Sequence, residues 1–235
     1  MNTRIYRPVP LGLTMLIALF SALAALAVSG GNNAAAHGNM SHQATPKASV
    51  QGATMPTKEF DLRQDMRKLW EDHITWTRLA VISLTTGSPD TNATVARLLR
   101  NQTDIGNAIK PYFGTAAGNE LTSLLRQHIL IAADLIAVAK KGDKAGVTAQ
   151  QARWTANADQ IATLLSSANP VSWKLGAMKT MMHDHLRLTT DEVVARLQHN
   201  WAADVRAYDR IHVQILHMAD MLSEGLVKQF PSRFQ

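Results

Sequence analysis

The chain has 235 residues, of which 24 are Lys or Arg and 18 are Asp or Glu, and it contains no cysteine. The lack of cysteine excludes thiol catalysis, zinc sites with Cys ligands, iron–sulfur clusters, covalently attached haem and a lipoprotein anchor. The net charge of +6 is mild and the basic residues are dispersed along the chain, so we expect no nucleic-acid partner.

Residues 1–36 have the pattern of a signal peptide. Arg4 and Arg7 form a positive start, residues 11–28 are apolar and uncharged, and residues 34–36 are an Ala-Ala-Ala cleavage site. The apolar run approaches the ~20 residues that span a bilayer, so a membrane tether through residues 11–28 is the alternative. In both cases the positive flank stays inside, and we expect export to a bacterial periplasm, a cell surface or the medium.

Residues 37–58 are rich in Gly, Ser, Ala, Pro, Gln and Asn and have few large apolar side chains, which predicts a disordered linker. Cleavage after Ala36 would make His37 the first residue of the mature protein. Its amine and imidazole, together with Met40 and His42, would then suit copper. The alternative, which we favour, is a polar linker that contains two histidines by chance.

Residues 59–235 are predicted to be a single all-α domain. Apolar residues recur there every three or four positions, the period of a helix, and no stretch alternates like a strand. Gly87, Gly114, Gly142 and Pro170 interrupt this pattern at points where helices end. The pattern predicts a bundle of about six helices, over 61–86, 90–112, 117–141, 147–168, 173–198 and 200–229.

Three segments of this domain share one pattern: two apolar residues, any residue, Asp or Gln, then His, then Ile or Leu. They are residues 69–74, 124–129 and 181–186. Their histidines are His73, His128 and His185, which are 55 and 57 residues apart. Because this spacing fits one helical hairpin, we expect three repeated hairpins built on one plan.

Each of the three histidines falls on the apolar stripe of its predicted helix, so the three imidazoles should point inward. The second helix of each expected hairpin has an aspartate in a similar setting. Two of these aspartates follow their histidine by 31 residues, whereas the third follows by only 24. The three aspartates are Asp104, Asp159 and Asp209.

Two interpretations of these residues remain open. In the first, which we favour, each histidine is a core side chain that hydrogen-bonds a neighbouring helix. In the second, the histidines, the aspartates and His212 converge on a divalent transition metal, as bundle cores allow. Such ligands suit zinc, iron, manganese or copper alike. The paired Glu-x-x-His motif of di-iron bundles is absent, and Asp209-x-x-His212 is the nearest approach to it.

Several runs of the chain resemble a family of poorly characterised exported bacterial proteins. The runs are residues 103–109, 124–143 and 188–225, and the resemblance covers 61–235. It implies a bacterial source and a helical bundle, and no established activity comes with it. Relatives are sometimes labelled glycosyltransferases. The sequence does not support that label, because the strand–glycine loop–helix pattern of a nucleotide-sugar domain is missing.

Two functions from different classes fit the sequence. The first is a binding protein that holds a metal ion or a small ligand between the hairpins. The second is a membrane-tethered interaction module without a cofactor, which uses a helix face for a protein partner or for self-association. No Ser nucleophile motif and no phosphate-binding glycine loop is present, so we assign no catalytic residue and favour a role other than catalysis.

Overall fold

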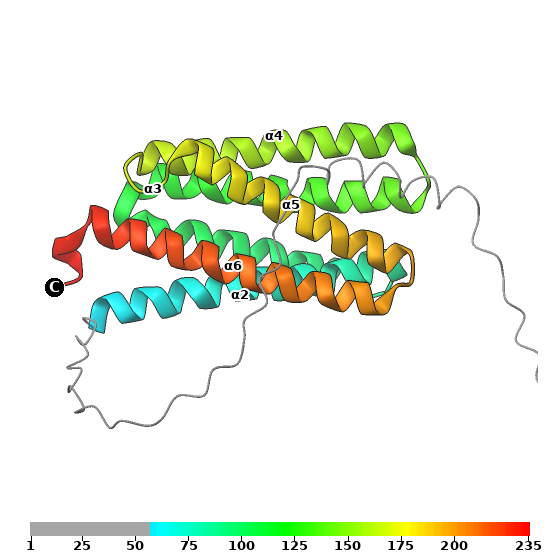
Figure 1. Ribbon diagram of the computed structural model, residues 1–235, viewed down its shortest axis with the longest axis horizontal. Helices are drawn as coiled ribbons and strands as arrows, with labels where there is room; N and C mark the ends of the chain where they lie inside the picture. Colours follow the sequence, from blue (N-terminus) through cyan, green and yellow to red (C-terminus); the bar gives the residue numbers. More distant parts are fainter. Residues whose placement is uncertain (1–56) are drawn as a thin grey trace, which may run out of the picture.

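The computed structural model describes residues 57–235, and this part of the chain contains α-helices and one 3₁₀ turn but no strand (Figure 1). The predicted all-α class is therefore confirmed. Residues 1–56, including the predicted signal peptide, His37 and His42, lie outside the described residues. The elements are α2 (Thr57–Thr86), α3 (Thr91–Lys140), α4 (Lys144–Ala168), α5 (Leu175–Leu197), α6 (Trp201–Gln229) and η1 (Pro231–Arg233).

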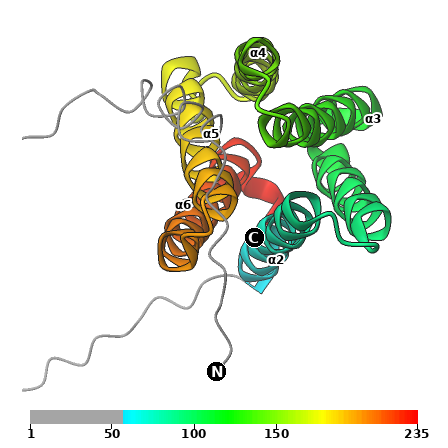
Figure 2. The same cartoon turned by 90° about the vertical axis from the view of Figure 1, so that its right-hand side faces the viewer.

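The helix α3 differs most from the sequence prediction, because it joins the two helices expected over 90–112 and 117–141. Only Gly114 departs from helical geometry inside it, with φ 84° and ψ 168°. Leu99 O accepts a hydrogen bond from Arg126 Nη1 at 3.1 Å, so the two halves of α3 run antiparallel (Figure 2). A single residue of positive φ, which glycine adopts at little cost, reverses the chain where a loop was expected. The described chain therefore has five α-helices in place of about six.

Two further glycines allow the halves of α3 to approach closely. A Cβ atom on Gly106 would lie 2.6 Å from the carbonyl oxygen of Gly118, and one on Gly118 would lie 2.6 Å from that of Gly106. The Gly106 Cβ would also collide with Thr122 Oγ1. Any side chain at either position would push the backbones apart.

The helices form a closed ring in the order of the chain. Helix α2 packs against α3, α3 against α4, α4 against α5, α5 against α6, and α6 returns to α2 (Figure 2). Lys58 Nζ also donates a hydrogen bond to the carbonyl oxygen of Gln235 at 3.0 Å. The two ends of the described chain therefore meet, and Thr57 and Lys58, predicted as linker, belong to α2.

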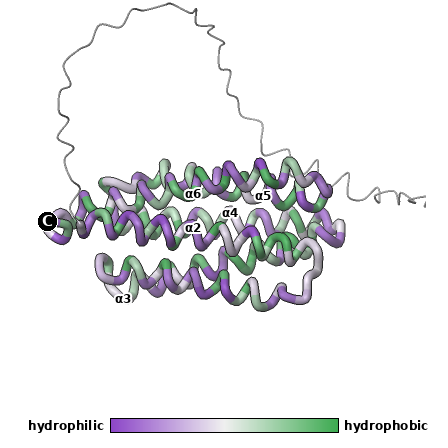
Figure 3. Tube along the Cα trace, turned by 90° about the horizontal axis from the view of Figure 1, so that it is seen from below, coloured by the Kyte–Doolittle hydropathy of each residue, from purple (hydrophilic) through white to green (hydrophobic). Residues whose placement is uncertain are grey.

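The core lies along the inside of this ring. Hydrophobic and hydrophilic residues are interleaved along every helix (Figure 3), as expected when one stripe of each helix is buried. Trp70, Ile161, Trp173 and Ile215 are among the residues of the largest core cluster. Among the described helices, α3 alone is long and apolar enough to cross a membrane. Because core helices pass the same test and the chain reverses at Gly114, we assign α3 to the core.

Candidate tri-histidine site

His73, His128 and His185 meet in the interior of the bundle. They come from α2, the second half of α3, and α5, and they are 2%, 3% and 4% exposed. The ring centroids of His73 and His185 are 5.9 Å apart, and those of His128 and His185 are 6.3 Å apart. The prediction that these imidazoles point inward is confirmed, and the distances show that they form one cluster.

The three imidazoles line one cavity of about 40 Å³, which is room for one or two atoms the size of a water oxygen. Among residues 57–235, no Asp or Glu lines the cavity. Thr77 Oγ1 and Thr189 Oγ1 donate to the carbonyl oxygens of His73 and His185, four residues earlier in each helix. The other lining residues are Val81, Ile129, Ala132, Leu135, Ile136, Trp154, Thr190 and Val193.

Each histidine uses its Nδ1 atom to contact an amide side chain 29 residues later in the chain. His128 Nδ1 donates to Asn157 Oδ1 at 2.9 Å, and His185 Nδ1 donates to Gln214 Oε1 at 3.1 Å. Because a neutral imidazole carries one proton, these bonds leave Nε2 as the unprotonated nitrogen. In both residues Nε2, the nitrogen that can bind a metal, therefore makes no hydrogen bond to the amide.

The same amides also tie the two helices of each pair together. Asn157 Nδ2 donates to Leu124 O at 3.0 Å, and Gln214 Nε2 donates to Met181 O at 3.3 Å. Each of these carbonyls lies four residues before the histidine that the amide contacts. One side chain thus fixes both the imidazole and the helix that carries it, which gives the cluster a rigid support.

At His73 the contact with the imidazole and the contact with the helix carbonyl are made by two neighbouring amides. Asn101 Nδ2 donates to Leu69 O at 3.0 Å, and Gln102 Nε2 lies 3.2 Å from His73 Nδ1. The Gln102 Oε1 atom is buried and has no hydrogen-bond partner within residues 57–235. Gln102 Nε2 also donates to Leu98 O at 2.8 Å and to Asn101 Oδ1 at 3.1 Å, so it meets His73 Nδ1 as a donor. The proton of the neutral His73 imidazole is then on Nε2, the reverse of the other two histidines.

Burial keeps the three imidazoles neutral. Desolvation lowers the pKa of His128 to about 3, with a smaller contribution from His185. Desolvation also lowers the pKa of His73 and that of His185, whereas the bond to Gln214 partly opposes this in His185. The neutral form is the one that binds a metal ion.

The Nε2 atom of His128 is the least satisfied polar atom of the cluster. It is buried and makes no hydrogen bond to any part of the chain that the structure describes. Trp154, whose ring centroid lies 5.2 Å from that of His128, covers the imidazole, and its own Nε1–H is likewise buried without a partner among residues 57–235. A buried polar atom without a partner is rare and calls for an explanation.

The remaining residues predicted for the site lie away from the cavity. Asp159 accepts hydrogen bonds from Lys179 Nζ and His183 Nε2, each at 2.9 Å, and the bond from Lys179 is the main reason that its pKa is lowered. His212 is partly exposed, and its Nε2 lies 2.9 Å from Glu71 Oε1. Asp104 is partly buried and Asp209 is exposed, and neither lines the cavity.

Sequence reasoning missed the amides because it looked for carboxylates. Gln102 and Asn157 come two residues before Asp104 and Asp159, and two residues turn a helix by about 200°. The aspartates therefore face away from the histidines that their neighbours contact. A search for Asn or Gln 29 residues after each histidine would have found all three partners.

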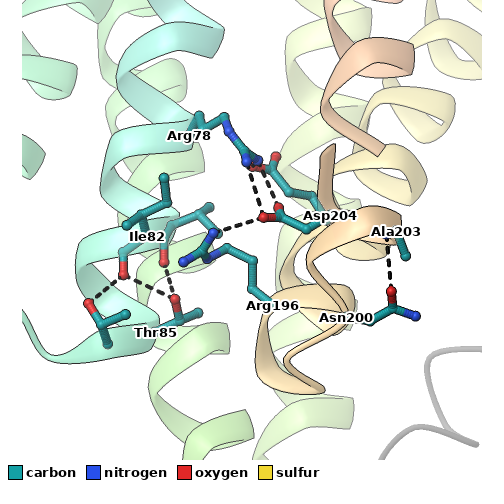
Figure 4. A network of polar contacts seen from close by, with 10 residues as sticks. Arg78, Ile82, Thr85, Arg196, Asn200, Ala203 and Asp204 are labelled. Atoms are coloured by element: carbon teal, nitrogen blue, oxygen red, sulfur yellow. Dashed lines mark hydrogen bonds and ion pairs between the residues drawn. The ribbon is translucent and has the colours of Figure 1, made fainter. Parts of the chain in front are cut away.

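A second polar cluster, which the sequence analysis did not find, joins α2, α5 and α6 (Figure 4). Arg78 Nη1 donates to Glu192 Oε1 at 2.6 Å and to Asp204 Oδ1 at 2.7 Å. Arg196 Nη1 donates to Asp204 Oδ2 at 2.8 Å. Glu192 and Asp204 are 1% and 2% exposed, so two carboxylates and two guanidinium groups form a buried ionic network.

Two residues of this ionic network are next to cavity-lining residues in the sequence. Arg78 follows Thr77 and Glu192 precedes Val193, and both Thr77 and Val193 line the cavity. Burial raises the pKa of Glu192 to about 7, and Asp204 adds to the rise, while Arg78 opposes it. With both carboxylates ionised, the network carries two positive and two negative charges and is neutral.

Within residues 57–235, no group of three or more His, Asp or Glu side chains is arranged to hold a metal ion as it stands. In comparisons with protein-family models, curated proteins and solved structures, no family model, protein or structure matches this chain.

Proposed function

We propose that this protein binds a transition-metal ion through the imidazoles of His73, His128 and His185. The observation that carries the proposal is the unpaired, buried Nε2 of His128 beside two other neutral imidazoles at one cavity. Imidazoles whose Nδ1 is held by a second side chain are the usual ligands of metal sites in proteins. The fixed 29-residue spacing between histidine and amide supports the expected repeat of three hairpins.

Two of the three ring pairs have separations close to those of a metal site. Imidazoles that bind one ion through Nε2 at 2.0–2.1 Å have ring centroids roughly 5–5.5 Å apart. The rings of His73 and His128 lie 5.9 and 6.3 Å from that of His185, which exceeds this by less than about 1.5 Å. Binding would draw the rings together. It would also require the His73 proton to move from Nε2 to Nδ1 and the Gln102 amide to turn away from Leu98 O and Asn101 Oδ1. The signal peptide predicted over 1–36 would put this site outside the cytoplasm.

Metal analysis of the untagged domain tests the proposal. We expect one equivalent of a transition metal per chain after reconstitution, and none in the His73/His128/His185→Ala variant. The matched control is His183/His212/His217→Ala, which removes as many imidazoles from the surface and should keep the metal. Circular dichroism checks that both variants are folded. A folded parent that takes up no metal, or a core variant that binds as the parent does, would refute the proposal.

The amide supports give a graded test of the same site. Replacing Gln214 with leucine removes the acceptor of His185 Nδ1–H, so the imidazole can change its tautomer and its orientation. We expect metal affinity to fall by roughly 10–100-fold, measured by competition with a chelator. Gln160→Leu, on the exposed surface of α4, is the control and should leave the affinity unchanged. Equal effects of the two variants would show that the Gln214 amide does not support the site.

A further inference from the structure

We infer that the tri-histidine site selects a monovalent ion, copper(I), over divalent zinc. This inference rests on the proposed function and goes beyond it, because it assigns the charge and the coordination geometry of the ion. It follows from three observations: the charge around the cavity, the separation of the rings and the lack of a fourth ligand.

The charge around the cavity is the first observation. Three neutral imidazoles bring no negative charge, and no carboxylate from the described part of the chain lines the cavity. The nearest buried carboxylates in sequence, Glu192 and Asp204, are already paired with Arg78 and Arg196. A divalent ion would therefore add two uncompensated charges to the interior. The cost of burying charge grows with its square, so a monovalent ion is strongly favoured.

The separation of the rings is the second observation. Around a tetrahedral ion, imidazoles bound through Nε2 have centroids roughly 5.2 Å apart, whereas three imidazoles in a plane around one ion have centroids roughly 5.5 Å apart. The observed 5.9 and 6.3 Å are nearer to the planar arrangement. Copper(I) accepts three ligands in a plane, whereas zinc in proteins is almost always tetrahedral.

The lack of a fourth ligand is the third observation. The hydroxyl protons of Thr77 and Thr189 are donated to helix carbonyls, and most of the other lining side chains are aliphatic. Zinc with three histidines takes a water as its fourth ligand, and such a water needs further polar partners. The threonine oxygens and Trp154 Nε1 could hold such a water, whereas a three-coordinate ion completes its coordination with the imidazoles alone and needs no water.

The experiment compares ions on the folded domain. Under anaerobic, reducing conditions, copper(I) affinity is measured by competition with bicinchoninate, and zinc affinity by competition with a chromophoric zinc chelator. We expect one equivalent of copper(I), bound at least roughly 100-fold more tightly than zinc. Zinc binding of equal or greater strength, with a tetrahedral cobalt(II) spectrum, would overturn this inference and leave the proposed function standing. Binding of neither ion would refute both.

A substitution at Ala132 tests the charge argument directly. Ala132 lines the cavity one helical turn after His128 and is partly buried, so a small polar side chain fits there. Ala132→Asp adds a carboxylate, and Ala132→Asn is its uncharged match. We expect the preference for copper(I) over zinc to fall at least tenfold in the Asp variant relative to the Asn variant. An unchanged preference would show that charge does not set the selectivity.

Discussion

Replacement of Arg78 by alanine is expected to destabilise the domain by about 3–5 kcal/mol, the usual cost of removing one partner from a buried ion pair. Arg78 bonds both Glu192 and Asp204, and both carboxylates are almost fully buried. Without Arg78, only Arg196 remains to balance them. Denaturant unfolding at pH 7.5, followed by circular dichroism, measures the change in the free energy of unfolding.

The surface pair of Arg67 and Asp220 is the matched control for this experiment. Arg67 makes the same kind of two-pronged contact with Asp220, but both side chains are more than one-third exposed. Arg67→Ala should therefore cost less than about 1 kcal/mol. If Arg78→Ala were no more costly than Arg67→Ala, the buried network would contribute nothing beyond an ordinary surface pair.

Metal-free protein is expected to lose stability as the pH falls below 6.5. The pKa of His128 in the folded state is about 3, whereas an unfolded histidine has a pKa near 6.5. Between these values the unfolded chain binds the proton and the folded chain does not. The stability that this neutral histidine contributes is complete above pH 6.5 and is lost toward pH 3, at about 1.4 kcal/mol per pH unit.

The carboxyl of Glu192 acts in the opposite direction. Its folded pKa, about 7, is raised above its ordinary value of 4.5, so the folded chain binds the proton more tightly. Its contribution to stability is present below pH 4.5 and is lost as the pH rises through 7. The parent would therefore show a sum of opposed slopes, because the lowered pKa values of all three histidines act against the raised pKa of Glu192.

The His128→Gln variant separates these contributions, because it keeps Glu192 and removes one buried imidazole. Between pH 6 and 4.5, its free energy of unfolding should fall less steeply than that of the parent, by about 1.4 kcal/mol per pH unit. Ile131→Ala, which removes buried aliphatic atoms without a titrating group, lowers stability but should keep the parental slope. Parallel pH profiles for the parent and His128→Gln would contradict the neutral state of His128.

Most helix ends could be predicted because the residues that end a helix lie next to it in the sequence. Gly87 and Gly142, both with positive φ, end helices where the sequence places glycine, and Asn169 caps α4 just before Pro170. The turn at Gly114 could not be predicted in detail. Whether one residue or a short loop reverses a chain depends on how closely the flanking helices pack. Here Gly106 and Gly118, which are several residues away from the turn, allow the close packing.

The site was only half predictable for a similar reason. The apolar stripe of each helix shows which histidines point inward, since it needs only the helical period. The partners of these histidines depend on how one helix is rotated against another. For His128, the sequence analysis chose Asp159, which is two residues from the observed partner Asn157. Arg78 and Asp204 are 126 residues apart, and no local pattern relates them. Long-range polar pairing of this kind requires the structure.

The contact between α2 and α6 sets this domain apart from open arrays of helical hairpins. In an open array each unit touches only its neighbours, the ends fray, and stability is close to a sum over units. Here the first and last helices of residues 57–235 pack against each other, so none of the described helices is terminal and the loss of one opens two seams. Unfolding should then be a single cooperative event, and the three histidines meet only when the last seam has closed.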